Sequence, residues 1–425
     1  MSATTQPPVR AETVRNWAGN VTFSPDRVHR PTSITQLQTI TARAPHIRAF
    51  GSGHSFNRIA ATTSDLIAVD RLPSVMDIDR EAMTVTVSAG TRYGDLATHL
   101  QRNGLALGNL GSLPHISVAG ACATATHGSG ISNQSLSSAV TSVTLVTADG
   151  DLVSLSRGEN TFGGAAVSLG ALGIVTSLSV EVCPTFDVEQ YVYDDLSWSA
   201  MLAHFDGIMA SAYSVSIFTH FDDRSRIWVK RRCGDSFNDL PDTGVRLARQ
   251  HQHPVAGMSA INCTEQLGTP GPWHERLPHF RADFRPATGD ELQSEYLVPQ
   301  ASAVAALESV HRIRTRFAPT LQISEIRTVA ADDCWLSPSY QRDSVAIHFT
   351  WRPDMSAVTT PLAEIEEALA PFDPRPHWGK IFAIGPDALS ASYQRWLDFA
   401  GLMRELDPAG KFRNDFIDHY FPNGD

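Results

Sequence analysis

The chain has 425 residues, of which 42% are hydrophobic and 19% are charged, and its formal net charge is −11. This composition is typical of a globular protein and excludes disorder as the default. A length prior of about 150 residues per domain predicts two or three domains. Nucleic acids and anionic membranes both need a basic partner surface, so the negative charge argues against either as a partner.

The N-terminal segment lacks the basic and apolar regions of a signal peptide, and no apolar run approaches the about 18 residues of a membrane span. The sequence therefore predicts a soluble, cytoplasmic protein. The five cysteines are odd in number and never spaced as Cys-x-x-Cys, which fits reduced thiols and predicts no metal site.

The first 184 residues mix helix and strand patterns, so an α+β domain is expected over 1–184. Capping and stop residues delimit its helices, and alternation of apolar and polar residues delimits its strands. In chain order we expect a helix capped by Ser33, a strand over 83–89, a helix over 93–100 stopped by Gly104, a hairpin around Asp149-Gly150, and a strand over 174–182 ended by Pro184.

Aromatic and charged residues become more frequent after this point, and a second domain is expected over 185–372. A C-terminal segment, 373–425, is expected to complete the site and return to the first domain. Helical spacing of apolar residues and strand-like alternation define the elements of the second domain. They are strands at 215–219, 323–329 and 345–351, a helix over about 301–317, and a helix carrying Leu362, Ile365 and Leu369.

One histidine lies inside a glycine- and serine-rich turn, Gly51-Ser52-Gly53-His54-Ser55. Glycines lack a Cβ and let backbone N–H groups approach a phosphate, so this turn is a candidate anion-binding loop. The alternative is a tight surface turn with a solvated histidine, because such turns are common.

A second stretch, residues 109–130, is rich in glycine, alanine, serine and threonine. So many small residues cannot fill a core, and they would let something large and flat lie against the backbone. A small-residue helix packed closely on a sheet is the alternative.

Two strands of the second domain carry polar groups on one face. Glu325 and Arg327, at positions i and i+2, project from the same side of their strand. His348, Thr350 and Arg352 share a face of the other strand, whose opposite face carries aromatic residues, an arrangement that suits the floor of a polar pocket. A surface ion pair and an edge strand with a wet side are the respective alternatives.

Lys380 follows a tryptophan and a glycine in the segment His377-Trp378-Gly379-Lys380. A lysine in such a turn is ordinarily solvated, unless the turn points inward.

In their order and spacing these motifs make the chain similar to the alditol oxidases (xylitol or sorbitol oxidase type) of the vanillyl-alcohol-oxidase family of covalent FAD flavoproteins. The resemblance covers nearly the whole chain, from Asn16 to Phe412. Its most specific parts are residues 51–56, 112–120, 325–328, 348–351 and 376–380.

The resemblance implies a two-domain α+β flavoprotein. Its FAD-binding domain would be covered by a substrate domain built on a large antiparallel sheet with helices on it. His54 would carry FAD covalently through the flavin's 8α-methyl group, and the loop around it would cradle the pyrophosphate. The residues implied to hold FAD are Ala49, Phe50, Gly51, Ser52, Gly53, His54, Ser55, Ser112, Ser117, Gly120, Thr124, Ala125, Thr126, His127 and Val175.

The implied activity is oxidation of the terminal primary hydroxyl of polyols such as xylitol and sorbitol to the aldose, with O2 reoxidising the flavin to give hydrogen peroxide. The resemblance places Ser112, Glu325, Arg327, Thr350 and Lys380 at the substrate. Lys380 and Arg327 are cations suited to a developing alkoxide, and His348 is a suitable proton acceptor. Which of these three catalytic candidates takes the proton stays open, and the family precedent allows a monomer.

Gly111 stands where alditol oxidases often have alanine. A smaller residue beside the flavin leaves O2 at least as much access, so we hypothesise an oxidase and not a dehydrogenase. The alternatives are a sugar-lactone oxidase or dehydrogenase of the same superfamily, and a flavin-binding protein without turnover.

Overall fold

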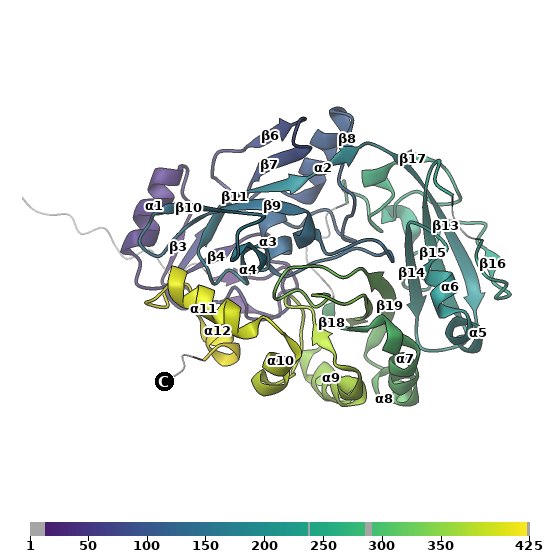
Figure 1. Cartoon of the computed structure of the whole chain (residues 1–425). Coiled ribbons are helices and arrows are strands. Elements are labelled where there is room, and N and C mark those ends of the chain that lie inside the picture. The colour runs from purple at the N-terminus through teal and green to yellow at the C-terminus, as the bar shows by residue number, and fades with distance from the viewer. Residues whose placement is uncertain (1–12, 237–238, 285–290, 423–425) are drawn as a thin grey trace, which may run out of the picture.

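The computed structural model in Figure 1 describes residues 13–422, apart from 237–238 and 285–290. The absence of a signal peptide was predicted from residues 1–8, which lie outside the described residues. The first half of the chain forms the left part of the molecule in Figure 1, and a large sheet from the second half forms the right part. Among the described residues no helix is both long and apolar enough to cross a bilayer.

Two small sheets and four helices make up the first part. The parallel sheet has the order β3 (Arg27–His29), β5 (Asp65–Ala68), β4 (Ile47–Phe50), and the antiparallel sheet has the order β10 (Leu152–Ser156), β9 (Val140–Val146), β11 (Ile174–Glu181), β7 (Thr84–Ser88), β6 (Met76–Asp79). The helices are α1 (Ile34–Arg43), α2 (Tyr93–Arg102), α3 (Val118–Ala123) and α4 (Phe162–Ala166). Short pairs of strands, β1 (Val14–Arg15) with β2 (Thr22–Phe23) and β8 (Leu105–Ala106) with β12 (Cys183–Pro184), complete it.

The capping and turn residues predicted for this part of the chain have the expected roles. The Ser33 side chain accepts a hydrogen bond from the Gln36 backbone N–H and so caps α1. Gly104 follows α2 with φ +73°, and Gly150 turns the β9–β10 hairpin with φ +89°, conformations that favour glycine. One boundary was wrong, because β11 ends at Glu181 and Pro184 pairs with β8 in a separate short strand.

The large sheet is antiparallel throughout and is built from strands between residues 187 and 376. Its order is β16 (Arg246–Leu247), β13 (Asp187–Leu196), β15 (Ser225–Arg232), β14 (Ser214–Thr219), β19 (Leu321–Val329), β20 (Ser344–Trp351), β18 (Leu292–Pro299), β21 (Arg375–Pro376), and β17 (Gly271–Pro272) also pairs with β13.

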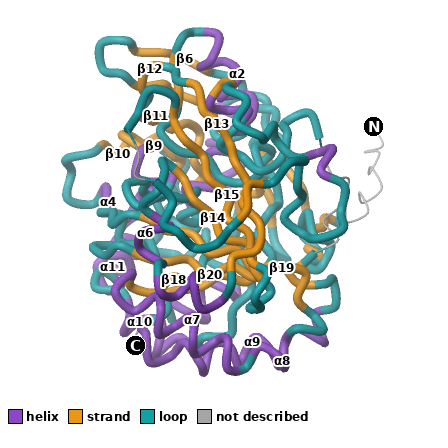
Figure 2. Tube along the Cα trace, turned by 90° about the vertical axis from the view of Figure 1, so that its right-hand side faces the viewer, coloured by secondary structure: helices purple, strands orange, loops and turns teal. Residues whose placement is uncertain are grey.

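Helices cover one face of this sheet, as Figures 1 and 2 show for α7, α8 and α9. Alternation along β20 turns Ile347, Phe349 and Trp351 toward the helices, where all three are fully buried. Burying such a side chain contributes about 1.5–3 kcal/mol to stability. The covering helices are α5 (Trp198–Ala203), α6 (Phe205–Met209), α7 (Ala303–Arg312), α8 (Arg314–Phe317) and α9 (Met355–Leu369).

Two details of the second half differ from expectation. The helix predicted over about 301–317 is interrupted at Ile313, the residue between α7 and α8. Arg352 lies beyond the end of β20 and is exposed, because its backbone N–H donates to the Thr320 carbonyl and the chain turns away from the sheet. It therefore does not share the polar face with His348.

The C-terminal segment lies against the first part of the molecule, where Figure 1 shows it in yellow. The ammonium group of Lys411 donates to the carbonyls of Thr41 (2.8 Å) and Ala148 (2.6 Å). The buried Arg48 guanidinium donates to the Phe412 carbonyl at 2.5 Å. Its helices are α10 (Pro386–Ser392), α11 (Trp396–Leu406) and α12 (Asp415–Tyr420). The division of the chain at 184 and 372 stays a prediction.

Candidate functional site

A cavity of about 540 Å³ lies between the two parts of the molecule. One wall comes from the glycine loop at 48–56, the small-residue stretch at 111–127, and residues 168–175. The other comes from β18, β19, β20 and the segment after β21. The sequence motifs that lie far apart in the chain therefore face one another across a single space.

His54 lies in the wall formed by the glycine loop. Its ring stacks on Trp17, with centroids 4.9 Å apart and planes 17° apart. Burial lowers the pKa of His54 to about 4, so the imidazole is neutral at neutral pH. Its buried Nδ1 has no hydrogen-bond partner within the described chain. His54 is partly buried, lines the cavity and stacks on Trp17, which argues against the alternative of a solvated surface histidine.

Gly51 and Gly120 lie so close to Ser117 that a side chain at either position would collide with it. A Cβ on Gly51 would lie 2.6 Å from Ser117 Oγ, and a Cβ on Gly120 would lie 2.8 Å from the same atom. Gly53 has φ +72°, a conformation that favours glycine. A wall of bare backbone with an unpartnered imidazole nitrogen fits a flat, phosphate-bearing group such as a flavin nucleotide.

The structure places nearly all the residues predicted to hold FAD in the cavity wall. Those that line it are Ala49, Phe50, Gly51, Ser52, Gly53, His54, Ser55, Ser112, Ser117, Gly120, Thr124, Thr126, His127 and Val175. Ala125 does not line the cavity, because its side chain is 1% exposed and packs into the hydrophobic core behind the wall, and its contact with FAD stays a prediction. Gly111 also lines the cavity.

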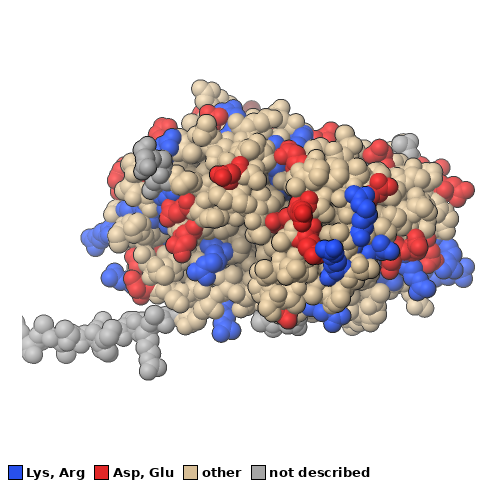
Figure 3. All heavy atoms as spheres, turned by 90° about the horizontal axis from the view of Figure 1, so that it is seen from below, with Lys and Arg blue, Asp and Glu red and all other residues tan. Residues whose placement is uncertain are grey.

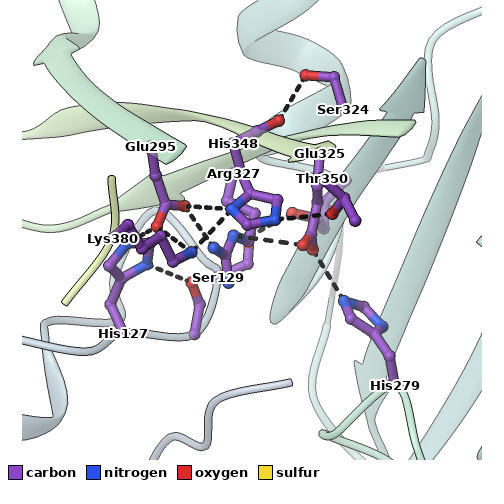
Figure 4. A network of polar contacts seen from close by, with 12 residues as sticks. His127, Ser129, His279, Glu295, Ser324, Glu325, Arg327, His348, Thr350 and Lys380 are labelled. Carbon is purple, nitrogen blue, oxygen red and sulfur yellow. Dashed lines mark hydrogen bonds and ion pairs between the residues drawn. The ribbon is translucent and has the colours of Figure 1, made fainter. Parts of the chain in front are cut away.

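The register of three strands brings the polar side chains of the opposite wall together. Glu295 on β18 is paired with His348 on β20, which is paired with Glu325 on β19. Paired residues point to the same face, so these three side chains form a row on the cavity side of the sheet. Figure 4 shows the row with Arg327 and Lys380 beside it.

Glu295 is the centre of the network, and its side chain is fully buried. One carboxylate oxygen lies 2.5 Å from Arg327 Nη2, and the other lies 2.7 Å from Lys380 Nζ and 3.5 Å from His127 Nε2. Burial by itself raises the pKa of Glu295, but the adjacent Arg327 and Lys380 outweigh it and hold that pKa well below its usual range. Glu295 is therefore an ionised carboxylate that fixes both cations.

Lys380, His348 and Thr350 form a chain of hydrogen bonds along the cavity wall. Lys380 Nζ lies 2.7 Å from His348 Nδ1, and His348 Nε2 lies 3.0 Å from Thr350 Oγ1. Since an ammonium group only donates, Nδ1 is the acceptor, and the ring proton on Nε2 is donated to Thr350. Burial, followed by the charge of Lys380, lowers the pKa of His348 well below its usual value. Burial also lowers the pKa of Lys380.

Glu325 borders the same network on the other side. Its Oε2 lies 3.7 Å from Arg327 Nε, and its Oε1 accepts from His279 Nε2 at 2.8 Å. Burial raises the pKa of Glu325, but Arg327 and His279 outweigh this effect and lower it. Glu325 and Arg327 do form an ion pair, but both are buried, so the alternative of an ion pair on the surface is wrong.

Every residue predicted to contact substrate lines the cavity, namely Ser112, Glu325, Arg327, Thr350 and Lys380, together with His348. Sequence reasoning missed Glu295, His279 and Lys230. For Glu295 a weak signal was present, since it directly precedes the apolar run Tyr296-Leu297-Val298, and an acid buried with such a strand needs a partner. Among the described residues, no group of three metal-ligating side chains is close enough to hold an ion.

Two family profiles match the chain, and each covers residues of one wall of the cavity. The profile of a family described as "FAD binding domain" matches residues 25–156. The profile of a family described as "D-arabinono-1,4-lactone oxidase" matches residues 290–420.

Two curated relatives align over nearly the whole chain. An alditol oxidase from a Streptomyces species is 50% identical, over 95% of this chain and 98% of that protein. An L-gulono-1,4-lactone dehydrogenase from Mycobacterium tuberculosis is 30% identical, over 94% of this chain and 97% of that protein.

Solved structures share the fold at low sequence identity. Cholesterol oxidase from Brevibacterium sterolicum superposes with a TM-score of 0.77 at 17% identity, covering 96% of each chain. Xylooligosaccharide oxidase from Myceliophthora thermophila gives 0.74 at 15% identity, covering 94% of this chain and 92% of the other. These likenesses confirm the predicted α+β fold class.

Proposed function

We propose that this chain oxidises the terminal hydroxyl of polyols such as xylitol and sorbitol. It belongs to the alditol oxidase branch of the vanillyl-alcohol-oxidase family of FAD-dependent oxidoreductases. The observation that carries the proposal is the shared cavity, in which the glycine wall faces the Glu295–Arg327–Lys380 network. FAD, when bound, accepts the hydride that leaves the carbinol carbon.

Two fixed cations are suited to hold the reacting hydroxyl. Arg327 and Lys380 share the buried carboxylate of Glu295, which holds both at the cavity wall. A cation that is already oriented stabilises an alkoxide without reorganising as negative charge develops, and one such donor contributes about 2.7–4 kcal/mol. The pair therefore lowers the cost of removing the hydroxyl proton.

Lys380 and His348 are the residues suited to take up that proton. Arg327 cannot serve as a base, because a guanidinium is not deprotonated in proteins. Lys380 can receive the hydroxyl proton if it passes one of its own to His348 Nδ1, which already accepts its hydrogen bond at 2.7 Å. Lys380 would then be the contact group and His348 a transient acceptor, since burial and the charge of Lys380 lower the pKa of its imidazole.

The remaining polar groups suit the other hydroxyls of a neutral polyol. The ionised carboxylate of Glu325 accepts hydrogen bonds, and the hydroxyls of Ser112 and Thr350 both donate and accept. Thr350 Oγ1 already accepts from His348, so its own proton is free to be donated into the cavity. A polyol offers such a donor and acceptor at each carbon.

On the cofactor side, we propose that His54 carries FAD covalently through its unpartnered Nδ1. Its neutral state supports this role, since the lone pair of an uncharged imidazole is available for a bond. Gly111 has room for a methyl group, because an added Cβ would meet nothing nearer than Thr126 Cγ2 at 3.6 Å. The glycine leaves this space open to O2, in keeping with release of hydrogen peroxide.

The test measures oxidase activity and whether the flavin stays attached to the denatured protein. Purified protein should consume O2 and form hydrogen peroxide with xylitol, and its flavin should remain in the pellet after acid precipitation. In His54→Ala the flavin should appear in the supernatant, with activity reduced but measurable. Greater turnover of L-gulonolactone than of xylitol would instead support a lactone-oxidising enzyme, the activity named for the 30% identical relative.

A further inference from the structure

A second buried lysine, Lys230, lies behind the polar wall of the cavity. It belongs to β15 and is 2% exposed. Its ammonium group donates to the Leu277 carbonyl and lies 3.2 Å from His279 Nδ1. Lys230 does not line the main cavity, so it cannot contact a substrate there directly.

His279 joins Lys230 to Glu325. Its Nε2 lies 2.8 Å from Glu325 Oε1, and its ring is held edge-on by Phe218 and Trp228 at centroid distances of 5.3 and 5.1 Å. Both ring nitrogens are thus engaged, and the two aromatic rings leave the imidazole little freedom to turn.

The hydrogen bonds from Lys230 to His279 and from His279 to Glu325 run in one direction, for chemical reasons. An ammonium group can only donate, so Lys230 donates to Nδ1, and the proton of the neutral ring must be on Nε2. Nε2 therefore donates to Glu325. Burial, followed by the charge of Lys230, lowers the pKa of His279 to about 4 and keeps the ring neutral.

Charges on the neighbouring elements bear on Lys230 as well. Glu325 attracts its charge and Arg327 repels it, both from β19, and the buried thiol of Cys263 lies on the loop packed against it. Burial lowers the pKa of Lys230 to about 7, against the opposing effect of Glu325. Below about pH 7, where Lys230 is protonated, the carboxylate of Glu325 therefore has a cation on each side, Lys230 and Arg327.

We propose that Lys230 and His279 are positioning residues that hold Glu325 ionised and oriented, so that its carboxylate accepts hydrogen bonds from polyol hydroxyls that do not react. This inference rests on the proposed function and extends it. Its consequence is that Lys230 acts on substrate binding only through Glu325, and leaves the hydride-transfer step nearly unchanged.

A double-mutant cycle tests this dependence. Lys230→Met keeps the length of the side chain and removes the charge, and it should raise KM for xylitol about 10-fold or more, as expected for losing support of a charge-assisted hydrogen bond. The change in kcat should stay within about threefold if hydride transfer is untouched. Added to Glu325→Gln, it should cause no further loss, whereas independent effects that multiply would overturn the proposal.

Two substitutions of His279 remove its two hydrogen bonds one at a time. His279→Gln retains a donor near the position of Nε2, and His279→Asn retains an acceptor near the position of Nδ1. If orientation of Glu325 is what matters, the Gln variant should keep a KM near the wild-type value and the Asn variant should resemble Lys230→Met. Equal losses in the two variants would overturn the proposal.

Lys411→Met is the matched control, because Lys411 also donates to backbone carbonyls and lies outside the cavity. It should lower the melting temperature without changing KM. If wild-type protein does not oxidise xylitol, the proposed function fails. The Lys230–Glu325 cycle is then measured on the free energy of unfolding, where additivity would overturn the inference and coupling would support it.

Discussion

The two walls of the cavity are built on opposite principles. The glycine wall, where we propose that FAD lies, is made of closely packed loops, and a Cβ added at Gly51 or Gly120 would meet Ser117 Oγ within 3 Å. The polar wall, where we propose that the polyol lies, is made of three paired strands that carry buried charges. The fully buried Glu295 lies between Arg327 and Lys380. We expect the glycine wall to bind its ligand through exposed backbone and the polar wall to bind its ligand through charged side chains held in place.

This difference predicts different sensitivities to substitution. Removing one charge from a buried network leaves its partners uncompensated in a medium of low dielectric constant. Adding a methyl group at Gly51 or Gly120 requires only that the hydroxyl of Ser117, the end of a short side chain, move out of the way. Substitutions in the sheet should therefore be the more costly of the two.

The largest effect is expected from Glu295→Gln. Two buried cations lose their shared counter-charge, so the free energy of unfolding should fall by about 3–5 kcal/mol, measured by urea denaturation. Activity on xylitol should fall with it.

The pH dependence of stability separates loss of charge from a packing defect. The native pKa of Glu295 lies below the ordinary value of 4.5, so its stabilisation is present above pH 4.5 and is lost as pH falls below that value. The melting temperature of the variant should depend less on pH than that of the wild type below this pH. Parallel curves would contradict the assigned ionisation.

A smaller effect on stability, and a main effect on catalysis, is expected from Lys380→Met, because Glu295 keeps Arg327 as a counter-charge. Loss of one oriented cation at the reacting hydroxyl should lower kcat about 10²–10³-fold. Steady-state oxygen consumption with xylitol measures this change, and the flavin content serves as the control. A rise in KM with unchanged kcat would show that Lys380 only binds the substrate.

The smallest effect is expected on the glycine wall, from Gly51→Ala. Overpacking against Ser117 Oγ should cost about 1–3 kcal/mol and lower the fraction of protein that holds flavin. Adding Ser117→Ala should restore both quantities, because Ser117 Oγ is the atom that an added Cβ would meet at 2.6 Å. Gly401→Ala is the matched control, since a Cβ there meets nothing within 4 Å.

The sequence predicted the glycine wall better than the polar wall, for a physical reason. His54 and its glycines are consecutive, so a local motif contains the whole feature. The network around Glu295 depends on strand register between residues 295, 325 and 348 and on the turn that brings Lys380 inward, none of which is encoded locally. Glu325, Arg327 and His348 were found because i, i+2 spacing reveals a shared face.

Other features were missed for the same reason. Lys230 lies on a strand two places away from Glu325 in the sheet order, and His279 lies on a loop after it. Their link to Glu325 is made only in three dimensions. The cytoplasmic location and the monomeric state remain predictions from the sequence.

The central proposal is that the buried charges of the sheet orient an alcohol, which then loses its hydride to a flavin held by the glycine wall. The most direct measurement is anaerobic mixing of purified protein with xylitol, followed by the visible absorbance of the flavin. Rapid bleaching in the wild type, slowed about 10²–10³-fold in Lys380→Met, is the predicted result. A wild-type flavin that stays oxidised with every polyol tested would contradict the account.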